Sequence, residues 1–192
     1  MFGDTFVFYV SIVVLGIIFI AQLYKRSMVL KLARTLFFVS VIGIFGNLAY
    51  LSYAQFLAFK NGPLGFTIST GEGIRWFLGY IQLHFLNQFL ISLIAAFIII
   101  FIVQYLNKKR GGQFFEREEL YVAVTGLFLV GYPGWLFYLG VMLVLPAIIS
   151  IIFVRRGERL PLYYFWMPTA VVVLVWVQFF AMHQAWWTQF RF

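Results

Sequence analysis

The sequence contains no cysteine, and this absence excludes several kinds of site. Disulfide bonds, thiolate nucleophiles, cysteine-bound zinc and cysteine-ligated iron–sulfur clusters all need that side chain. Acidic residues are also scarce, because six Asp and Glu stand against fourteen Lys and Arg, and the one aspartate is Asp4. A site built on a pair of aspartates is therefore excluded, and any paired carboxylates must be glutamates.

Charged residues of either sign are few, at 10% of the 192 residues, whereas 64% are hydrophobic. A soluble domain carries about 25% charged residues, because its surface must face water. A lipid bilayer removes that requirement. The formal net charge of +8 could indicate nucleic-acid binding in a soluble protein. Here the basic residues lie in short runs between apolar segments, so we expect no nucleic-acid partner and an all-α integral membrane protein.

Apolar runs are long enough for membrane-spanning helices, which need about 20 residues each. The runs are Thr5–Tyr24, Thr35–Phe59, Trp76–Leu106, Leu120–Phe153 and Leu162–Trp187. Gly131-Tyr132-Pro133-Gly134 interrupts the fourth run, and such a sequence breaks a helix and favours a tight turn. We therefore predict a six-helix transmembrane bundle of one domain, residues 1–192, with helices 4 and 5 as a tight hairpin. A re-entrant hairpin is the alternative.

The basic residues predict the orientation of the chain. Connectors 25–34, 107–119 and 154–161 hold four, four and three Lys or Arg, eleven of the fourteen. Cytoplasmic loops of membrane proteins carry such an excess, so both termini are predicted to lie on the outer side, with a polar outer loop from Lys60 to Arg75. The start of the chain is acidic and its positive charges follow the first run, which is typical of a first span rather than of a cleaved signal peptide. The inner membrane is the expected location, as a multi-pass protein.

Tryptophan and small residues add two expectations. Trp76, Trp135, Trp186 and Trp187 fall at predicted outer helix ends, where amphipathic rings favour the headgroup region. In the second run, one helical face carries Ser40, Gly43, Asn47, Tyr50 and Ala54. Close helix contact in lipid needs small residues, so we expect this face to be buried against a neighbouring helix.

The third run carries the most polar face. Tyr80, His84, Gln88 and Ser92 recur every four residues, with Asn87 beside them. Polar side chains in hydrocarbon usually face the bundle interior, so His84, Asn87 and Gln88 are candidates for binding a small molecule, a proton or a quinone. Hydrogen bonds that fix helix packing are the alternative interpretation. The other histidine, His183, would complete a bis-histidine haem site in a further alternative.

A second candidate site lies at the predicted inner end of the fourth helix. Glu116 and Glu119 share a helical face there, and paired carboxylates could perform acid–base catalysis. Acidic side chains also simply stabilise a helix N-terminus. Neither a metal site nor a cofactor is predicted.

Residues 111–172 resemble the C-terminal half of the type IV prepilin peptidases, polytopic aspartic peptidases of the inner membrane. Gly111-Gly112 precedes the glutamates, Gly131–Gly134 breaks the hairpin, and a basic loop, Arg155–Arg159, leads into Leu160-Pro161-Leu162-Tyr163. The family's catalytic aspartates have no counterpart here. The resemblance therefore implies a degenerate, non-catalytic relative that packs with other membrane proteins, or else a peptidase that uses Glu116 and Glu119.

Overall fold

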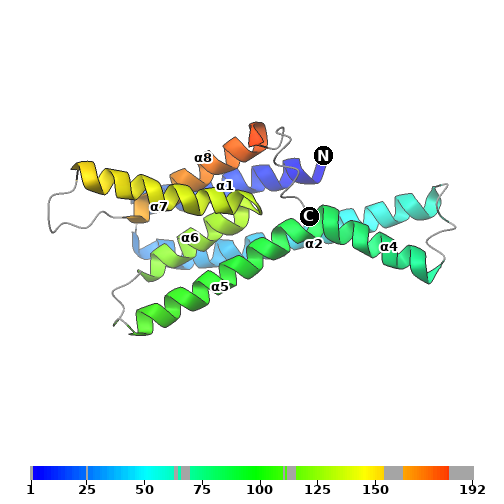
Figure 1. Ribbon diagram of the computed structural model, residues 1–192, viewed down its shortest axis with the longest axis horizontal. Coiled ribbons are helices and arrows are strands. Elements are labelled where there is room, and N and C mark those ends of the chain that lie inside the picture. The colour runs from blue at the N-terminus through cyan, green and yellow to red at the C-terminus, as the bar shows by residue number, and fades with distance from the viewer. Residues whose placement is uncertain are drawn as a thin grey trace.

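The computed structural model describes residues 2–24, 26–62, 65, 70–109, 111, 116–153 and 162–181. Within these ranges the protein is helical and has no β-strand, in agreement with the predicted all-α class (Figure 1). The α-helices are α1 (Phe2–Tyr24), α2 (Arg26–Asn61), α4 (Gly71–Ile81), α5 (Asn87–Lys109), α6 (Arg117–Val130), α7 (Gly134–Phe153) and α8 (Trp166–Phe179). A π-helical turn, η1 (Gln82–Leu86), joins α4 to α5, and a 3-10 turn, η2 (Leu162–Tyr164), precedes α8.

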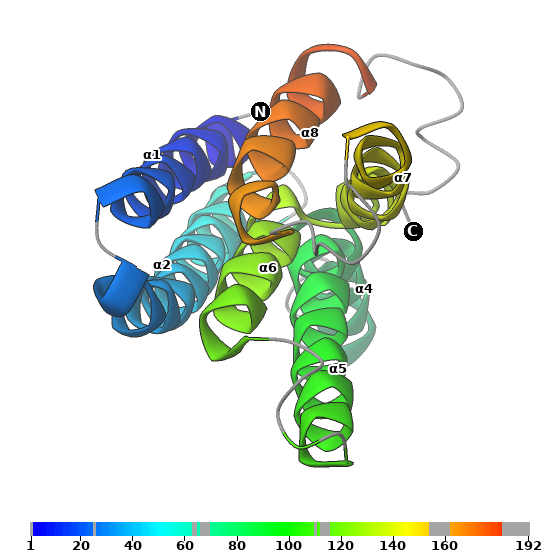
Figure 2. The same ribbon diagram turned by 90° about the vertical axis from the view of Figure 1, so that its left-hand side faces the viewer.

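Helix α6 is the centre of the bundle. It contacts α1, α2, α5, α7 and α8, and Figure 2 shows it among them. A helix that is hydrophobic on all sides must be surrounded by protein or lipid. Here protein surrounds it, since Val122, Val124 and Phe128 on different faces are fully buried. Helix α6 is short, at 14 residues or about 21 Å, which is less than the thickness of about 30 Å of a hydrocarbon layer.

The predicted hairpin between the fourth and fifth helices is confirmed. Helix α6 ends at Val130 and α7 begins at Gly134, and the two helices pack against each other. Gly131 adopts φ of 72°, a left-handed conformation that glycine reaches without a steric penalty. A Cβ at this position would also lie 2.8 Å from Nε2 of Gln88. The turn thus needs glycine both for its backbone conformation and for the close approach of α5.

The predicted connector at 25–34 is wrong. Helix α2 already begins at Arg26, and residues 26–34 form its first turns. This segment contains neither Gly nor Pro, and Lys, Arg, Leu and Met are all good helix formers. The basic residues here belong to the first turns of a helix whose later residues are mostly apolar, so they do not indicate a loop between helices.

The outer loop is also shorter than predicted. Helix α2 continues to Asn61 and α4 begins at Gly71, so helix replaces both ends of the expected loop 60–75. Thr70 starts α4 by accepting a 3.1 Å hydrogen bond from the backbone N–H of Gly73. The last turns of α2 and all of α4 form a paired projection beyond the rest of the bundle, which we call the arm (residues 55–61 and 71–81; Figure 1).

The predicted burial of the small-residue face of α2 is wrong for most of its members. Ser40 is buried and Asn47 is half-buried, but Gly43, Tyr50 and Ala54 are exposed. A Cβ on Gly43 would meet nothing within 4 Å. This face therefore points outward, next to the larger apolar side chains of the same helix.

Within the described ranges, three segments are long and apolar enough to cross a membrane, namely Thr5–Tyr24, Met28–Asn61 and Gly71–Lys109. The apolar helix segments Gly134–Ile149 and Trp166–Phe179 are shorter. The ends of α1, α5 and α7 and the starts of α2, α6 and η2 all lie at one end of the molecule, which we call the connector end (Figure 1).

Candidate functional site

The side chain of Glu119 lies in the first turn of α6 near the connector end and is only 9% exposed. Its Oε1 accepts a 2.9 Å hydrogen bond from Nε1 of Trp166, at the start of α8. Trp166 also packs against Tyr138 of α7, with ring centroids 5.9 Å apart. A buried carboxylate needs such a donor, because loss of water from it is costly. Glu119 thus ties the central helix to the beginning of the last one.

A second polar contact holds the same part of α8. Gln22, near the end of α1, is 3% exposed, and its Nε2 donates a 3.0 Å hydrogen bond to the backbone oxygen of Tyr163. Its Oε1 is buried without a hydrogen-bond partner. The entry into α8 is therefore fixed from two sides, by α1 through Gln22 and by α6 through Glu119.

Glu116 and Glu119 have different surroundings. Glu116 occupies the N-cap position of α6, makes no side-chain capping bond and is exposed. Glu119 is one turn further and buried against an indole. Arg34 of α2 lies over the ring of Tyr121 in α6, with its guanidinium carbon 5.9 Å from the ring centre. One carboxylate of the predicted pair is therefore exposed and the other is buried. A catalytic site made of these two side chains stays a prediction.

The π turn changes the polar face predicted on the third run. A π turn inserts one extra residue into an α-helix, so residues before and after it no longer keep the spacing of four. His84 lies within the turn and is exposed, while Asn87 and Gln88 follow it and are half-buried. Ser92 is fully buried and donates a 2.7 Å hydrogen bond to the backbone oxygen of Gln88.

His84 belongs to an aromatic ladder on the arm side of the turn. Its ring stacks on Tyr80, with centroids 4.3 Å apart, and Tyr80 stacks on Trp76 at 6.0 Å. Nδ1 of His84 donates a 3.0 Å hydrogen bond to the backbone oxygen of Tyr80. His183, the other member of the haem alternative, lies outside the described residues.

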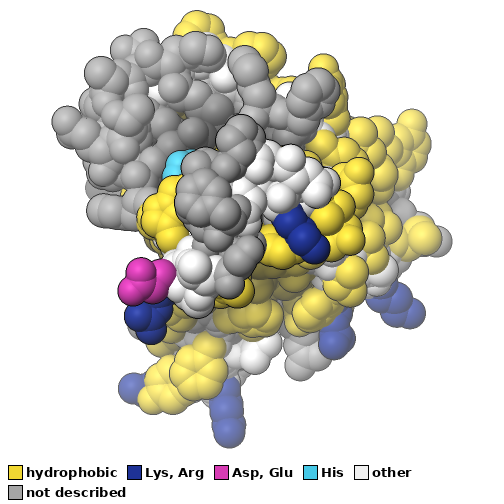
Figure 3. All heavy atoms as spheres, turned by 90° about the vertical axis from the view of Figure 1, so that its right-hand side faces the viewer, with side chains coloured by type: hydrophobic (Ala, Val, Ile, Leu, Met, Phe, Trp, Pro, Cys, Tyr) yellow, Lys and Arg dark blue, Asp and Glu magenta, His cyan; other side chains and the backbone are white. Residues whose placement is uncertain are grey.

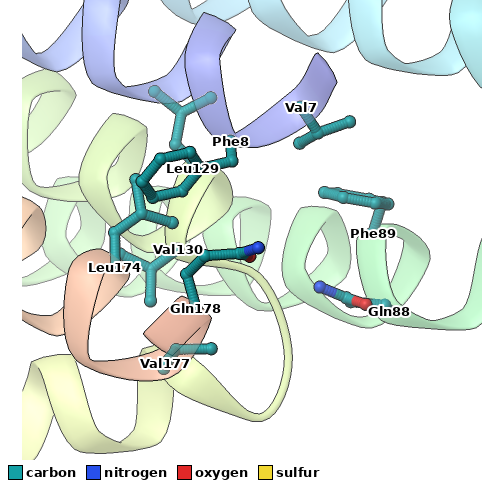
Figure 4. Close-up of a pocket in the computed structure, with 9 residues that line it drawn as sticks. All are labelled: Val7, Phe8, Gln88, Phe89, Leu129, Val130, Leu174, Val177 and Gln178. Atoms are coloured by element: carbon teal, nitrogen blue, oxygen red, sulfur yellow. The ribbon is translucent and has the colours of Figure 1, made fainter. Parts of the chain in front are cut away.

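Gln88 lines a pocket on the other side of the turn. Figure 4 shows Gln88 and Gln178 among apolar side chains from α1, α5, α6 and α8. The lining residues are Val7, Phe8, Gln88, Phe89, Leu129, Val130, Leu174, Val177 and Gln178. The pocket has room for about one water molecule, at about 30 Å³. Close by, Ser11 donates a 3.4 Å hydrogen bond to the backbone oxygen of Leu129.

The chemistry of this pocket is limited to neutral hydrogen bonding. Two amide side chains offer donors and acceptors, but the lining contains no acid, base, hydroxyl or thiol. General acid–base and nucleophilic catalysis need such groups. The pocket can hold a water molecule or the polar end of a small ligand. Gln88 and Gln178 both line the pocket, and His84 is not part of its lining.

Two features escaped the sequence analysis. The first is the π turn, whose five residues include no Gly or Pro that could indicate it. The second is the polar pair Gln22 and Glu119 around the start of α8. Gln22 carried a usable signal, since it is a lone amide inside an apolar run and such residues usually face the interior.

Among the residues that the structure describes, no group of three or more His, Asp and Glu side chains could hold a metal ion. Comparison with known proteins adds no relative, because no family model, curated protein or solved structure matches the chain.

Proposed function

We propose that the chain is a multi-pass inner-membrane protein with six spans and both termini outside, and that it serves as a non-catalytic component of a membrane assembly. The observation that carries the proposal is the apolar character of the outward faces of its helices. On α5 these faces expose Ile94, Phe97, Ile98, Phe101 and Tyr105. In water this surface would be strongly unfavourable, at about 25 cal/mol per Å².

The position of the connectors supports the proposed orientation. The helix ends that flank the three predicted basic connectors lie at one end of the molecule (Figure 1). Lys31, Lys108 and Lys109 belong to this end, whereas Lys60 and Arg75 belong to the arm at the other end. An excess of basic residues at one end is the arrangement that the positive-inside rule describes.

The interior supports a role in assembly rather than catalysis. The carboxylate of Glu119 is engaged by Trp166, and the pocket beside Gln88 offers only neutral amides. The likeness of residues 111–172 to prepilin peptidases fits this role if the protein is a degenerate relative. Its helices would then present their outward faces to lipid and to partner membrane proteins.

Single-cysteine labelling tests topology without background, because the chain has no cysteine of its own. In intact cells we expect a membrane-impermeant maleimide to modify Lys60→Cys and Glu72→Cys, and to reach Lys31→Cys and Lys108→Cys only after lysis. Ile98→Cys, in the middle of α5, should stay unmodified in both conditions. Labelling of Lys31→Cys and Lys60→Cys from the same side would overturn the proposed orientation.

The peptidase alternative is tested separately with Glu116→Gln and Glu119→Gln. A peptidase that uses these side chains loses cleavage of its precursor in either variant, whereas an assembly component leaves every precursor processed as before. Accumulation of an unprocessed membrane precursor in both variants, with normal amounts of the variant protein, would contradict the non-catalytic role.

A further inference from the structure

Helix α4 has a wider apolar surface than its partner helix covers. Phe77 and Ile81 are buried, and Phe77 packs edge-on against Phe56 and Phe59 of α2, with ring centroids 5.6 and 5.7 Å apart. On one side of this contact Ile74 and Leu78 are exposed, and on the other side Trp76 is exposed. At 100° per residue these side chains span an arc of about 200°, of which α2 covers the middle.

The opposite face of α4 is polar. Glu72 and Arg75 lie there, both exposed, and Gly79 follows on the same face. A helix that is apolar on one side and charged on the other is typical of helices that lie in a membrane interface. In water the two exposed flanks, with Trp76 and Leu78 each 60% exposed, would have no cover.

The lengths of the helices place the arm at the depth of lipid headgroups. From Arg34, α2 rises about 30 Å in twenty residues and reaches Ala54, which matches the hydrocarbon thickness. From Lys108, α5 covers the same distance at Gln88. The arm begins beyond both points, and the π turn bends α4 away from the axis of α5 (Figure 1).

The side chains of the arm fit that layer. Trp and Tyr favour the headgroup region, and the ladder of Trp76, Tyr80 and His84 supplies stacked amphipathic rings there. Lys60 and Arg75 are exposed cations that complement lipid phosphates. Seen from the end of the arm, hydrophobic side chains cover much of the described surface and basic ones are scattered among them (Figure 3).

We propose that the arm is not part of a span but an interfacial anchor, which lies in the headgroup layer of the outer leaflet with phospholipid against both exposed flanks of α4. The inference rests on the membrane residence proposed above. The outward apolar face of α2, which carries Tyr50, Tyr53 and Leu57, continues into the arm. Phospholipid is favoured over a protein partner because the uncovered surface lies on both sides of α4, where one docked helix would reach only one side.

Depth-dependent quenching tests the anchor in the full-length protein. Leu78→Cys carries a bimane label in vesicles of phosphatidylcholine and phosphatidylglycerol, with Ile74→Cys as a second position on the same flank. Ile98→Cys, whose parent side chain is 52% exposed in the middle of α5, is the matched control for membrane residence. We expect lipids brominated near the glycerol end of the acyl chain to quench the label at 78 most. Lipids brominated near the methyl end should quench the label at 98 most.

The outcomes separate the anchor from the membrane proposal. Quenching of positions 78 and 74 by aqueous iodide, without quenching by brominated lipid, would place the arm in water and overturn the anchor. Protection from both quenchers would place the flank against protein, either a second copy or another chain, and would overturn it as well. In both cases quenching at 98 by brominated lipid leaves membrane residence intact. Loss of lipid quenching at all three positions refutes both proposals.

Discussion

At the scale of single residues, the packing of α6 depends on a missing side chain. A Cβ on Gly126 would lie 2.7 Å from Oη of Tyr138 and 3.1 Å from Cβ of Ala170. Tyr138 is fully buried and its hydroxyl donates a 3.3 Å hydrogen bond to the backbone oxygen of Ala123, so it has little room to move. Gly126 therefore sets the distance at which α7 and α8 approach the central helix.

The first prediction follows from this contact. Gly126→Ala should lower the free energy of unfolding by about 1–3 kcal/mol, the usual effect of overpacking a core. Gly140→Ala on α7 is the matched control, because a Cβ there meets nothing within 4 Å. It should be neutral or stabilising by up to about 1 kcal/mol from helix propensity. Thermal unfolding in detergent, followed by tryptophan fluorescence, measures both. Equal stability of the two variants would contradict the described packing.

Two tryptophans give a second prediction at this scale. Nε1 of Trp166 donates to Glu119, whereas Nε1 of Trp135 is buried without a hydrogen-bond partner. Trp166→Phe should therefore destabilise the protein by about 1–3 kcal/mol beyond the effect of Trp135→Phe, because hydrogen bonds to charged groups are the stronger ones. The same chemical change at both sites cancels most of the difference in ring size. If Trp135→Phe proves the more damaging of the two, Glu119 does not hold α8 through its indole.

The site residues show what the sequence could and could not predict. The position of Glu119 at the start of a helix could be predicted from the sequence. Its hydrogen-bond partner, Trp166, could not, because it lies 47 positions away in the chain. Hydrogen bonds between distant segments depend on how the helices are arranged, which no local pattern encodes. Gln88 lines the pocket between helices, whereas His84, four positions earlier, is exposed, and the ligand-binding role of both stays a prediction.

At the scale of elements, the hairpin was predictable because glycine and proline have local effects on the backbone. The start of α2 was not, because a run of basic residues occurs both in loops and in helices. Lysine and arginine are good helix formers and extend their charged ends to the membrane surface, so a helix passes through such a segment unbroken. The π turn at Gln82–Leu86 follows from no single residue type, and it decides which way the arm points.

The third prediction tests that turn. Deletion of Leu83, which is exposed, should restore continuous α-helical spacing and rotate α4 by about 100° relative to α5. Phe77 would then leave Phe56, and a short bis-maleimide should no longer cross-link Phe56→Cys to Phe77→Cys. The control Leu83→Ala keeps the chain length and should retain the cross-link. Persistence of the cross-link after the deletion would show that α4 does not take its direction from the π turn.

At the scale of the whole molecule, composition bears on the medium around the protein more directly than on its topology. The scarcity of charge indicated lipid, and large apolar side chains such as Ile98 and Phe101 lie exposed on outward helix faces. Composition does not determine the number of spans. Helix α6, for example, is buried by protein on all sides and is shorter than the hydrocarbon layer. A central helix of this kind needs no lipid contact, and hydrophobicity alone does not distinguish it from a helix that faces the bilayer.

The last prediction therefore places a charge on an outward face. Ile98 lies at the middle of α5, and Ile98→Arg adds a cation where the side chain has no water within reach if the proposed membrane surrounds it. Insertion of arginine at such a position is unfavourable by about 2.5–3.5 kcal/mol. The amount of protein that resists alkaline extraction from membranes should fall accordingly. Tyr105→Arg also places an arginine at an exposed site of α5, one turn from Lys108, where the guanidinium can reach the membrane surface, and it should be tolerated. In a water-soluble bundle both substitutions would be harmless, because each replaces an exposed apolar side chain by a charged one. A normal yield of Ile98→Arg would therefore refute lipid as the medium around this helix.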